Sequence, residues 1–168
     1  MYSLKPLSRD AVPAALAKAE RYRLLNEPTE AESICLDVLQ IEPENQEALI
    51  MLILALTDQF PRTSGSSRTA PSRAGDLIAR LSEPYDREYY AGIIRERRAK
   101  AVLDRDSYAA AATAVEWLRE AMGCYERAEA IRPAHNDEAV LRWNACARLL
   151  QQLPEQALDQ REEPIQLE

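Results

Sequence analysis

Two stretches of the chain, EAESICLDVLQIEPENQEA at residues 30–48 and EAMGCYERAEAIRPAHNDEA at residues 120–139, share one pattern that determines the fold class. Each is a helical segment that ends in Ile-x-Pro, followed by a short turn with Asn and a new helix that begins at Glu-Ala. Proline stops the first helix because it cannot continue the hydrogen-bonded ladder. Self-similarity of this kind is typical of helical-repeat proteins.

The first stretch, extended backwards, also places residues of defined size at regular positions. They are Ala19, Tyr22, Ala31, Cys35, Val38 and Pro43, separated by three, nine, four, three and five residues. Small residues let two antiparallel helices cross closely, and larger ones fill the space beside the crossing. This pattern resembles the tetratricopeptide repeat, which is about 34 residues long.

The second stretch matches only the back half of that repeat, through Ala121, Tyr125, Ala128 and Pro133. The front half departs from the family pattern, since Ala109 and Ala112 stand at positions of other size. In the first copy Ala15 and Lys18 replace a large aromatic residue and a leucine.

The resemblance implies an all-α fold, a short right-handed α–α superhelix (a tetratricopeptide-like solenoid) of about seven helices. The alternative is an unrelated helical bundle that uses Ala and Pro similarly. We predict helices over 10–25, 28–41, 45–60, 75–81, 85–103, 107–131 and 137–153, with the first six paired in order and the seventh capping the stack. Residues 1–153 form one domain, in which the Ser-, Pro-, Gly- and Arg-rich segment 61–75 is a surface loop. Residues 154–168 form an acidic tail.

Composition excludes several classes of function. The formal net charge of −7 disfavours a nucleic-acid partner, because phosphate binding needs a positive surface. The longest apolar run, 48–56, is shorter than the roughly 20 residues that span a bilayer, so no membrane insertion is expected. Cys35, Cys124 and Cys146 are too widely spaced for a metal knuckle, and we expect the first two to pack in the core. No apolar signal region begins the chain, which favours a cytoplasmic location.

No catalytic constellation is recognisable. The single histidine, His135, lies in a turn beside Asn136, where a cap or a solvated residue is the expected role. The chain has no Gly-rich phosphate loop and no Gly-x-Ser-x-Gly motif. We therefore predict a protein that is not an enzyme and uses no cofactor and no metal.

Members of the resembled family usually bind their ligands in a concave groove lined by the first helix of each pair. Carried over by helix and spacing, this resemblance predicts eight partner-binding residues: Glu20, Arg23, Ile50, Leu54, Tyr89, Ile93, Arg97 and Arg148. The four apolar members would line the middle of the groove, or else they are buried. Some family members clamp a C-terminal carboxylate with Lys, Asn and Arg, and those groups are missing at the corresponding positions.

Two further features concern partners. The basic segment Arg95, Arg97, Arg98 and Lys100 is either a solvated face paired with nearby acids or a surface for an acidic partner segment. Ile165 and Leu167 in the tail are expected to dock on an apolar surface of the same or a neighbouring chain. The sequence thus favours an adaptor or assembly factor that binds a protein or peptide. The alternative is a structural subunit of a homo-oligomer or larger complex.

Overall fold

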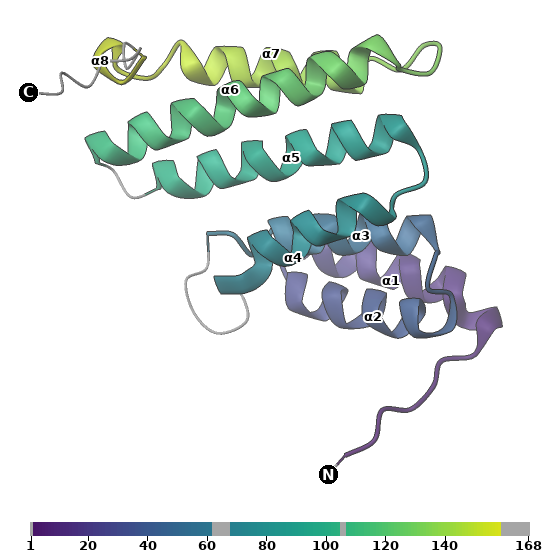
Figure 1. The fold of residues 1–168 in the computed structure, drawn as a ribbon. Coiled ribbons are helices and arrows are strands. Elements are labelled where there is room, and N and C mark those ends of the chain that lie inside the picture. The colour runs from purple at the N-terminus through teal and green to yellow at the C-terminus, as the bar shows by residue number, and fades with distance from the viewer. Residues whose placement is uncertain (1, 62–67, 105–106, 159–168) are drawn as a thin grey trace, which may run out of the picture.

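The computed structural model describes residues 2–61, 68–104 and 107–158, and every regular element in these ranges is a helix (Figure 1). The all-α prediction is therefore confirmed. The helices are α1 (Val12–Leu24), α2 (Pro28–Ile41), α3 (Gln46–Thr57), α4 (Ala70–Leu77), α5 (Pro84–Leu103), α6 (Tyr108–Ala130), α7 (Glu138–Leu150) and α8 (Glu155–Leu158). A 3₁₀ turn, η1 (Arg9–Ala11), precedes α1, and another, η3 (Ile78–Arg80), follows α4.

Local signals explain where the helices begin and end. Proline occupies the first turn of α1, α2, α4 and α5, where its missing N–H costs no hydrogen bond. The side chains of Asn45 and Ser107 cap α3 and α6 by accepting hydrogen bonds from backbone N–H groups, at 2.9 and 3.1 Å. Asn26, just after α1, has a φ of 59°, the left-handed conformation that commonly ends a helix.

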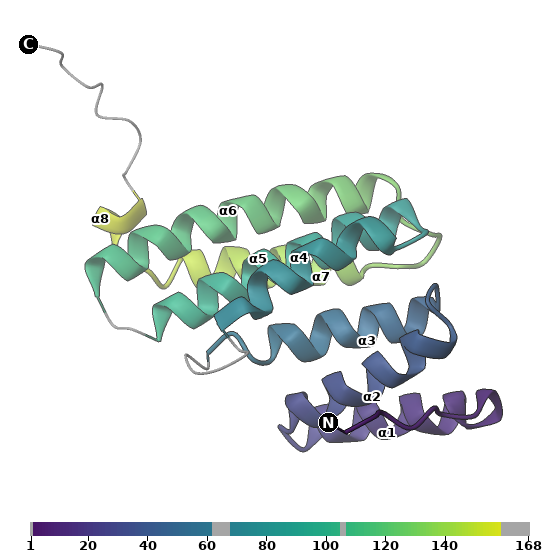
Figure 2. The ribbon, with the colours of Figure 1, turned by 60° about the horizontal axis from the view of Figure 1, so that its bottom comes forward.

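Neighbours in sequence are neighbours in space. The helices pack as α1 with α2, α3 with α4, and α5 with α6, as predicted, while α2 also packs on α3 and α6 on α7. Figure 2 shows α1, α3 and α5 following one another through the stack. The helix with the largest fraction of buried residues is α3, in which seven of the twelve residues are buried, among them Leu49, Ile53 and Leu56. It joins a core among α1–α4 to a second core among α5–α7.

Several small residues of the repeat pattern are buried. Ala19, Ala31 and Ala121 have no exposed surface at all. The helices α5 and α6 approach each other closely at Gly92, because a Cβ atom built there would lie 2.5 Å from Cε1 of Tyr125. Gly92 therefore lets the ring of Tyr125 pack directly on the backbone of α5.

The prediction that residues 61–75 form a loop is wrong for residues 70–75, because these belong to α4. The polar composition of this segment suggested a loop. Pro71, however, is compatible with a first helical turn, and the four-residue spacing of Ala70 and Ala74 puts both side chains on one buried face of the helix. Arg73 also pairs with Glu32 of α2. Residues 62–67 lie outside the described part of the chain.

The predicted tail begins with structure. Residues 155–158 form α8, and Ala157 is 1% exposed against α6. The predicted seventh helix ends earlier than expected, at Leu150 instead of residue 153. Ile165 and Leu167 lie outside the described residues.

Candidate functional site

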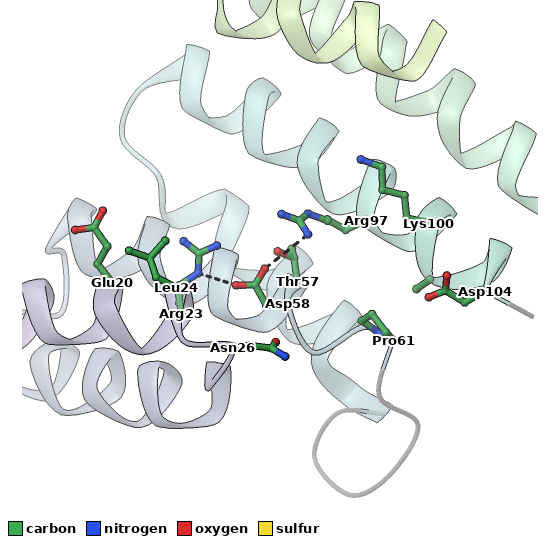
Figure 3. A pocket seen from close by; sticks show the side chains of 11 residues that line it. Glu20, Arg23, Leu24, Asn26, Thr57, Asp58, Pro61, Arg97, Lys100 and Asp104 are labelled. Carbon is green, nitrogen blue, oxygen red and sulfur yellow. Dashed lines mark hydrogen bonds and ion pairs between the residues drawn. The ribbon is translucent and has the colours of Figure 1, made fainter. Parts of the chain in front are cut away.

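A cleft of about 390 Å³ lies where the C-terminal parts of α1, α3 and α5 come together (Figure 3). Eight of its eleven lining residues have polar or charged side chains. The residues that form it are Glu20, Arg23, Leu24, Asn26, Thr57, Asp58, Pro61, Arg97, Lys100, Ala101 and Asp104. The helices α1, α3 and α5 are the first members of the three packed pairs α1–α2, α3–α4 and α5–α6.

Asp58 is the central carboxylate of this cleft. Its Oδ2 accepts a hydrogen bond from Nε of Arg23 at 2.8 Å, and its Oδ1 lies 3.8 Å from Nη1 of Arg97. Asp58 caps the C-terminus of α3, where the helix dipole disfavours a negative charge. The positive charges of the two guanidinium groups offset this unfavourable interaction. Their ion pairs with Asp58 also link α1 and α5 to the end of α3.

A buried carboxylate, Glu96, lies on α5 next to the cleft. It is 1% exposed, and its Oε2 accepts a hydrogen bond from the Tyr125 hydroxyl at 2.7 Å. Its Oε1 accepts from Lys100 and, at 3.4 Å, from Nη1 of Arg142 on α7. Burial alone would raise the pKa of Glu96, but the hydrogen bonds from Lys100 and Tyr125 outweigh it and leave the pKa lowered.

Cationic side chains and carboxylates are equal in number in and beside the cleft. Four cationic side chains, those of Arg23, Arg97, Lys100 and Arg142, pair with Asp58 and Glu96. Two further carboxylates, Glu20 and Asp104, line the cleft beside them. This local arrangement contrasts with the net charge of −7 for the whole chain.

The structure brings three of the eight predicted partner-binding residues together in the cleft: Glu20, Arg23 and Arg97. Arg148 is exposed on α7 and does not line it.

The four apolar members of the set do not line the cleft. Tyr89 and Ile93 are only 8% and 2% exposed and belong to the core around Tyr125. Ile50 and Leu54 are half-buried against the two cores. Burial, the second of the two interpretations open from the sequence, accounts for Tyr89 and Ile93. The reason is that α6 packs on the face of α5 that carries Tyr89 and Ile93.

Asp58 and Lys100 are two charged residues of the cleft that are absent from the predicted set of eight. A signal for Lys100 was available, because the spacing of three from Arg97 puts both on one face of a helix. Asp58 had a comparable signal, because it follows Leu54 by four residues on the same helix face, but its ion pairs depend on Arg23 and Arg97, which lie far away in sequence.

The basic segment of α5 divides between two faces of the helix. Arg97 and Lys100 line the cleft. Arg95 and Arg98 lie on the opposite face, where Nε of Arg95 bonds Glu120 at 3.1 Å and the Arg98 guanidinium lies 3.9 Å from the ring centre of Trp117. The ion pairs expected from the sequence thus exist, but they account for only part of this segment.

Groups suited to bond-making chemistry do not converge in the described ranges. No group of three or more His, Cys, Asp or Glu side chains there could hold a metal ion. Burial raises the pKa of the Cys35 and Cys146 thiols to about 12, which leaves them protonated near neutral pH. His135 is exposed in its turn, while Asn136 beside it accepts hydrogen bonds from Tyr85 and from the backbone of Glu138. In the same ranges no helix has the length and apolar character needed to cross a membrane.

Comparison of the chain with protein-family models, with curated proteins and with solved structures found no match.

Proposed function

We propose that this chain is a non-enzymatic interaction module that holds a segment of a protein partner in the cleft between α1, α3 and α5. The observation that carries the proposal is the meeting of three first helices around charged, partly exposed side chains. The resemblance to tetratricopeptide repeats supports it, since the cleft lies on the helices that would line the groove of a right-handed superhelix.

Arg97 is the residue best suited to contact the partner. Its side chain is 36% exposed, and its guanidinium is 3.8 Å from Asp58, longer than a direct hydrogen bond. Its Nε is buried and has no hydrogen-bond acceptor among the described residues. A partner cannot reach the buried Nε, but the exposed end of the guanidinium carries N–H donors that a partner's carboxylate or carbonyl oxygen would satisfy.

The cleft is also prepared for binding before a partner arrives. Arg23 is held by Asp58, and Lys100 is held by the buried Glu96. Side chains that are already fixed lose little conformational freedom on binding, which preserves affinity. Because the apolar side chains below are in the core, we propose polar recognition here rather than an apolar anchor.

The test selects peptides from a random displayed library against the whole chain and measures their affinity by calorimetry. We expect Arg97→Ala to weaken binding by about tenfold or more, because a charge-assisted hydrogen bond is lost. Arg148→Ala, which removes an exposed arginine outside the cleft, should leave affinity unchanged. Equal binding by the Arg97→Ala variant would refute the assignment of the cleft. So would an NMR titration in which the peptide shifts backbone amide signals only on other surfaces.

The alternative role, a structural subunit, has one observation in its favour. The outer face of α1, at one end of the stack, is hollowed beside Ala14, Ala17 and Leu25, and Leu25 is exposed. Lys18 and Arg21 also line this hollow, so a chain that stacked there would contact apolar and cationic side chains together. Size-exclusion chromatography with light scattering distinguishes the two roles. A stable oligomer that Ala17→Glu dissociates would favour the subunit, whereas a monomer favours the adaptor.

A further inference from the structure

The face of α5 opposite the candidate site carries a second cleft, between α4, α5 and α6. Its volume is about 440 Å³. Ile78 and Ile94 supply apolar surface, Arg95 and Arg98 supply charge, and Gly75 and Trp117 complete the part relevant here. None of these residues lines the first cleft, so the two surfaces are separate.

Arg98 is held in place without its charge being neutralised. Its guanidinium stacks on Trp117 at 3.9 Å from the ring centre. Within the described ranges no carboxylate lies within ion-pairing distance of it. Stacking on an aromatic face uses the plane of the guanidinium and leaves its N–H donors, which point outward in that plane, available for a carboxylate.

The neighbouring charges leave the cleft positive. Arg95 lies one helical turn before Arg98. Its Nε donates a hydrogen bond to Oε2 of Glu120 at 3.1 Å. Two guanidinium groups thus face one carboxylate. Burial and the nearby Arg95 lower the pKa of Arg98 by more than Glu120 raises it, which indicates that an added negative charge would be favourable at this position.

We propose that this second cleft binds an acidic segment of a protein partner, with a carboxylate on Arg98 and an adjacent aliphatic side chain against Ile78 and Ile94. The excess of positive charge from Arg95 and Arg98 favours an acidic side chain in the partner. The apolar surface of Ile78 and Ile94 favours an aliphatic side chain next to it. Arg98 gives the contact its geometry, because a stacked guanidinium accepts a carboxylate through two parallel hydrogen bonds. This site does not depend on the function proposed for the first cleft.

Gly75 provides a way to close the cleft without disturbing the fold. A Cβ atom built on Gly75 meets nothing within 4 Å, so a larger side chain there enters open space. Gly75→Leu should therefore occupy part of the cleft while leaving α4 intact.

The experiment observes the indole N–H signals of the full-length chain by NMR, where Trp117 reports on the cleft and Trp143, on α7, serves as the internal reference. The probe is the capped peptide acetyl-Glu-Leu-Glu-Leu-Glu-amide, and its control is the same peptide with Gln in place of Glu. We expect the acidic peptide to shift the Trp117 signal with saturation and the Gln peptide to leave it unchanged. Arg98→Gln should weaken binding by about tenfold.

The outcomes separate clearly. Weakening or loss of the Trp117 shift in both Arg98→Gln and Gly75→Leu, with thermal midpoints no lower than that of the parent chain, supports the site. Absence of any Trp117 shift with the acidic peptide overturns it. An equal shift with the Gln peptide, or equal affinity in the Arg98→Gln variant, also overturns it because recognition would then not involve the charge.

Discussion

Replacing Gly92 with alanine tests how closely α5 and α6 are packed. The new Cβ would lie 2.5, 2.8 and 2.9 Å from three carbons of the Tyr125 ring. That ring has no exposed surface, and its hydroxyl donates to the buried Glu96. It therefore cannot move aside without breaking a hydrogen bond to a charged group. Overpacking costs about 1–3 kcal/mol and the lost bond about 1.5–3 kcal/mol.

The better helix propensity of alanine offsets about 1 kcal/mol of this cost. We expect Gly92→Ala to lower the free energy of unfolding by about 2 kcal/mol or more, which corresponds to roughly 4–8 °C in thermal midpoint for a chain of this size. Gly75→Ala is the matched control, because it is the same substitution in a helix with open space around the Cβ. It should raise stability by about 0.5–1 kcal/mol.

Urea denaturation followed by circular dichroism, with calorimetry for the midpoints, measures both variants against the parent chain. The reasoning requires opposite signs for the two glycines. If Gly92→Ala were neutral or stabilising, the close approach of α5 and α6 at Tyr125 would be refuted.

Four further predictions concern packing, charge and thiol reactivity. Ala31→Leu should cost about 1–3 kcal/mol in urea denaturation, since Ala31 has no exposed surface, and an unchanged midpoint would contradict the crossing. Replacing residues 70–75 with a Gly-Ser linker should destabilise by more than about 1 kcal/mol, because the alanines lost there are buried. The lowered pKa of Glu96 stabilises the fold above the unfolded-state value near 4.5, and this stability is lost as pH falls through the lower folded-state pKa. Acid unfolding of Glu96→Gln should therefore depend less steeply on pH over that window. Cys35 and Cys146 should react with a thiol reagent at pH 8 only after denaturation, because both are buried and have pKa values of about 12.

The sequence by itself determined the helices and much of their pairing. Proline in first turns, the capping residue Asn45 and the spacing of small residues are local signals, and they act within a few positions of each other. The fully buried alanines, including Ala31 and Ala121, follow from the same short-range pattern. Segment 70–75 was misjudged because composition cannot reveal that Ala70 and Ala74 find a buried surface on another helix.

Only the tertiary structure decided which side chains form the candidate site. Arg23, Asp58 and Arg97 come from three helices and are separated by 35 and 39 positions in sequence, so no local spacing relates them. Tyr89 and Arg97 lie on the same face of α5, yet the first is buried under neighbouring helices and the second borders a cleft. Helical periodicity determines the face on which a residue lies, whereas exposure depends on what packs against that face, which is a property of the whole assembled stack.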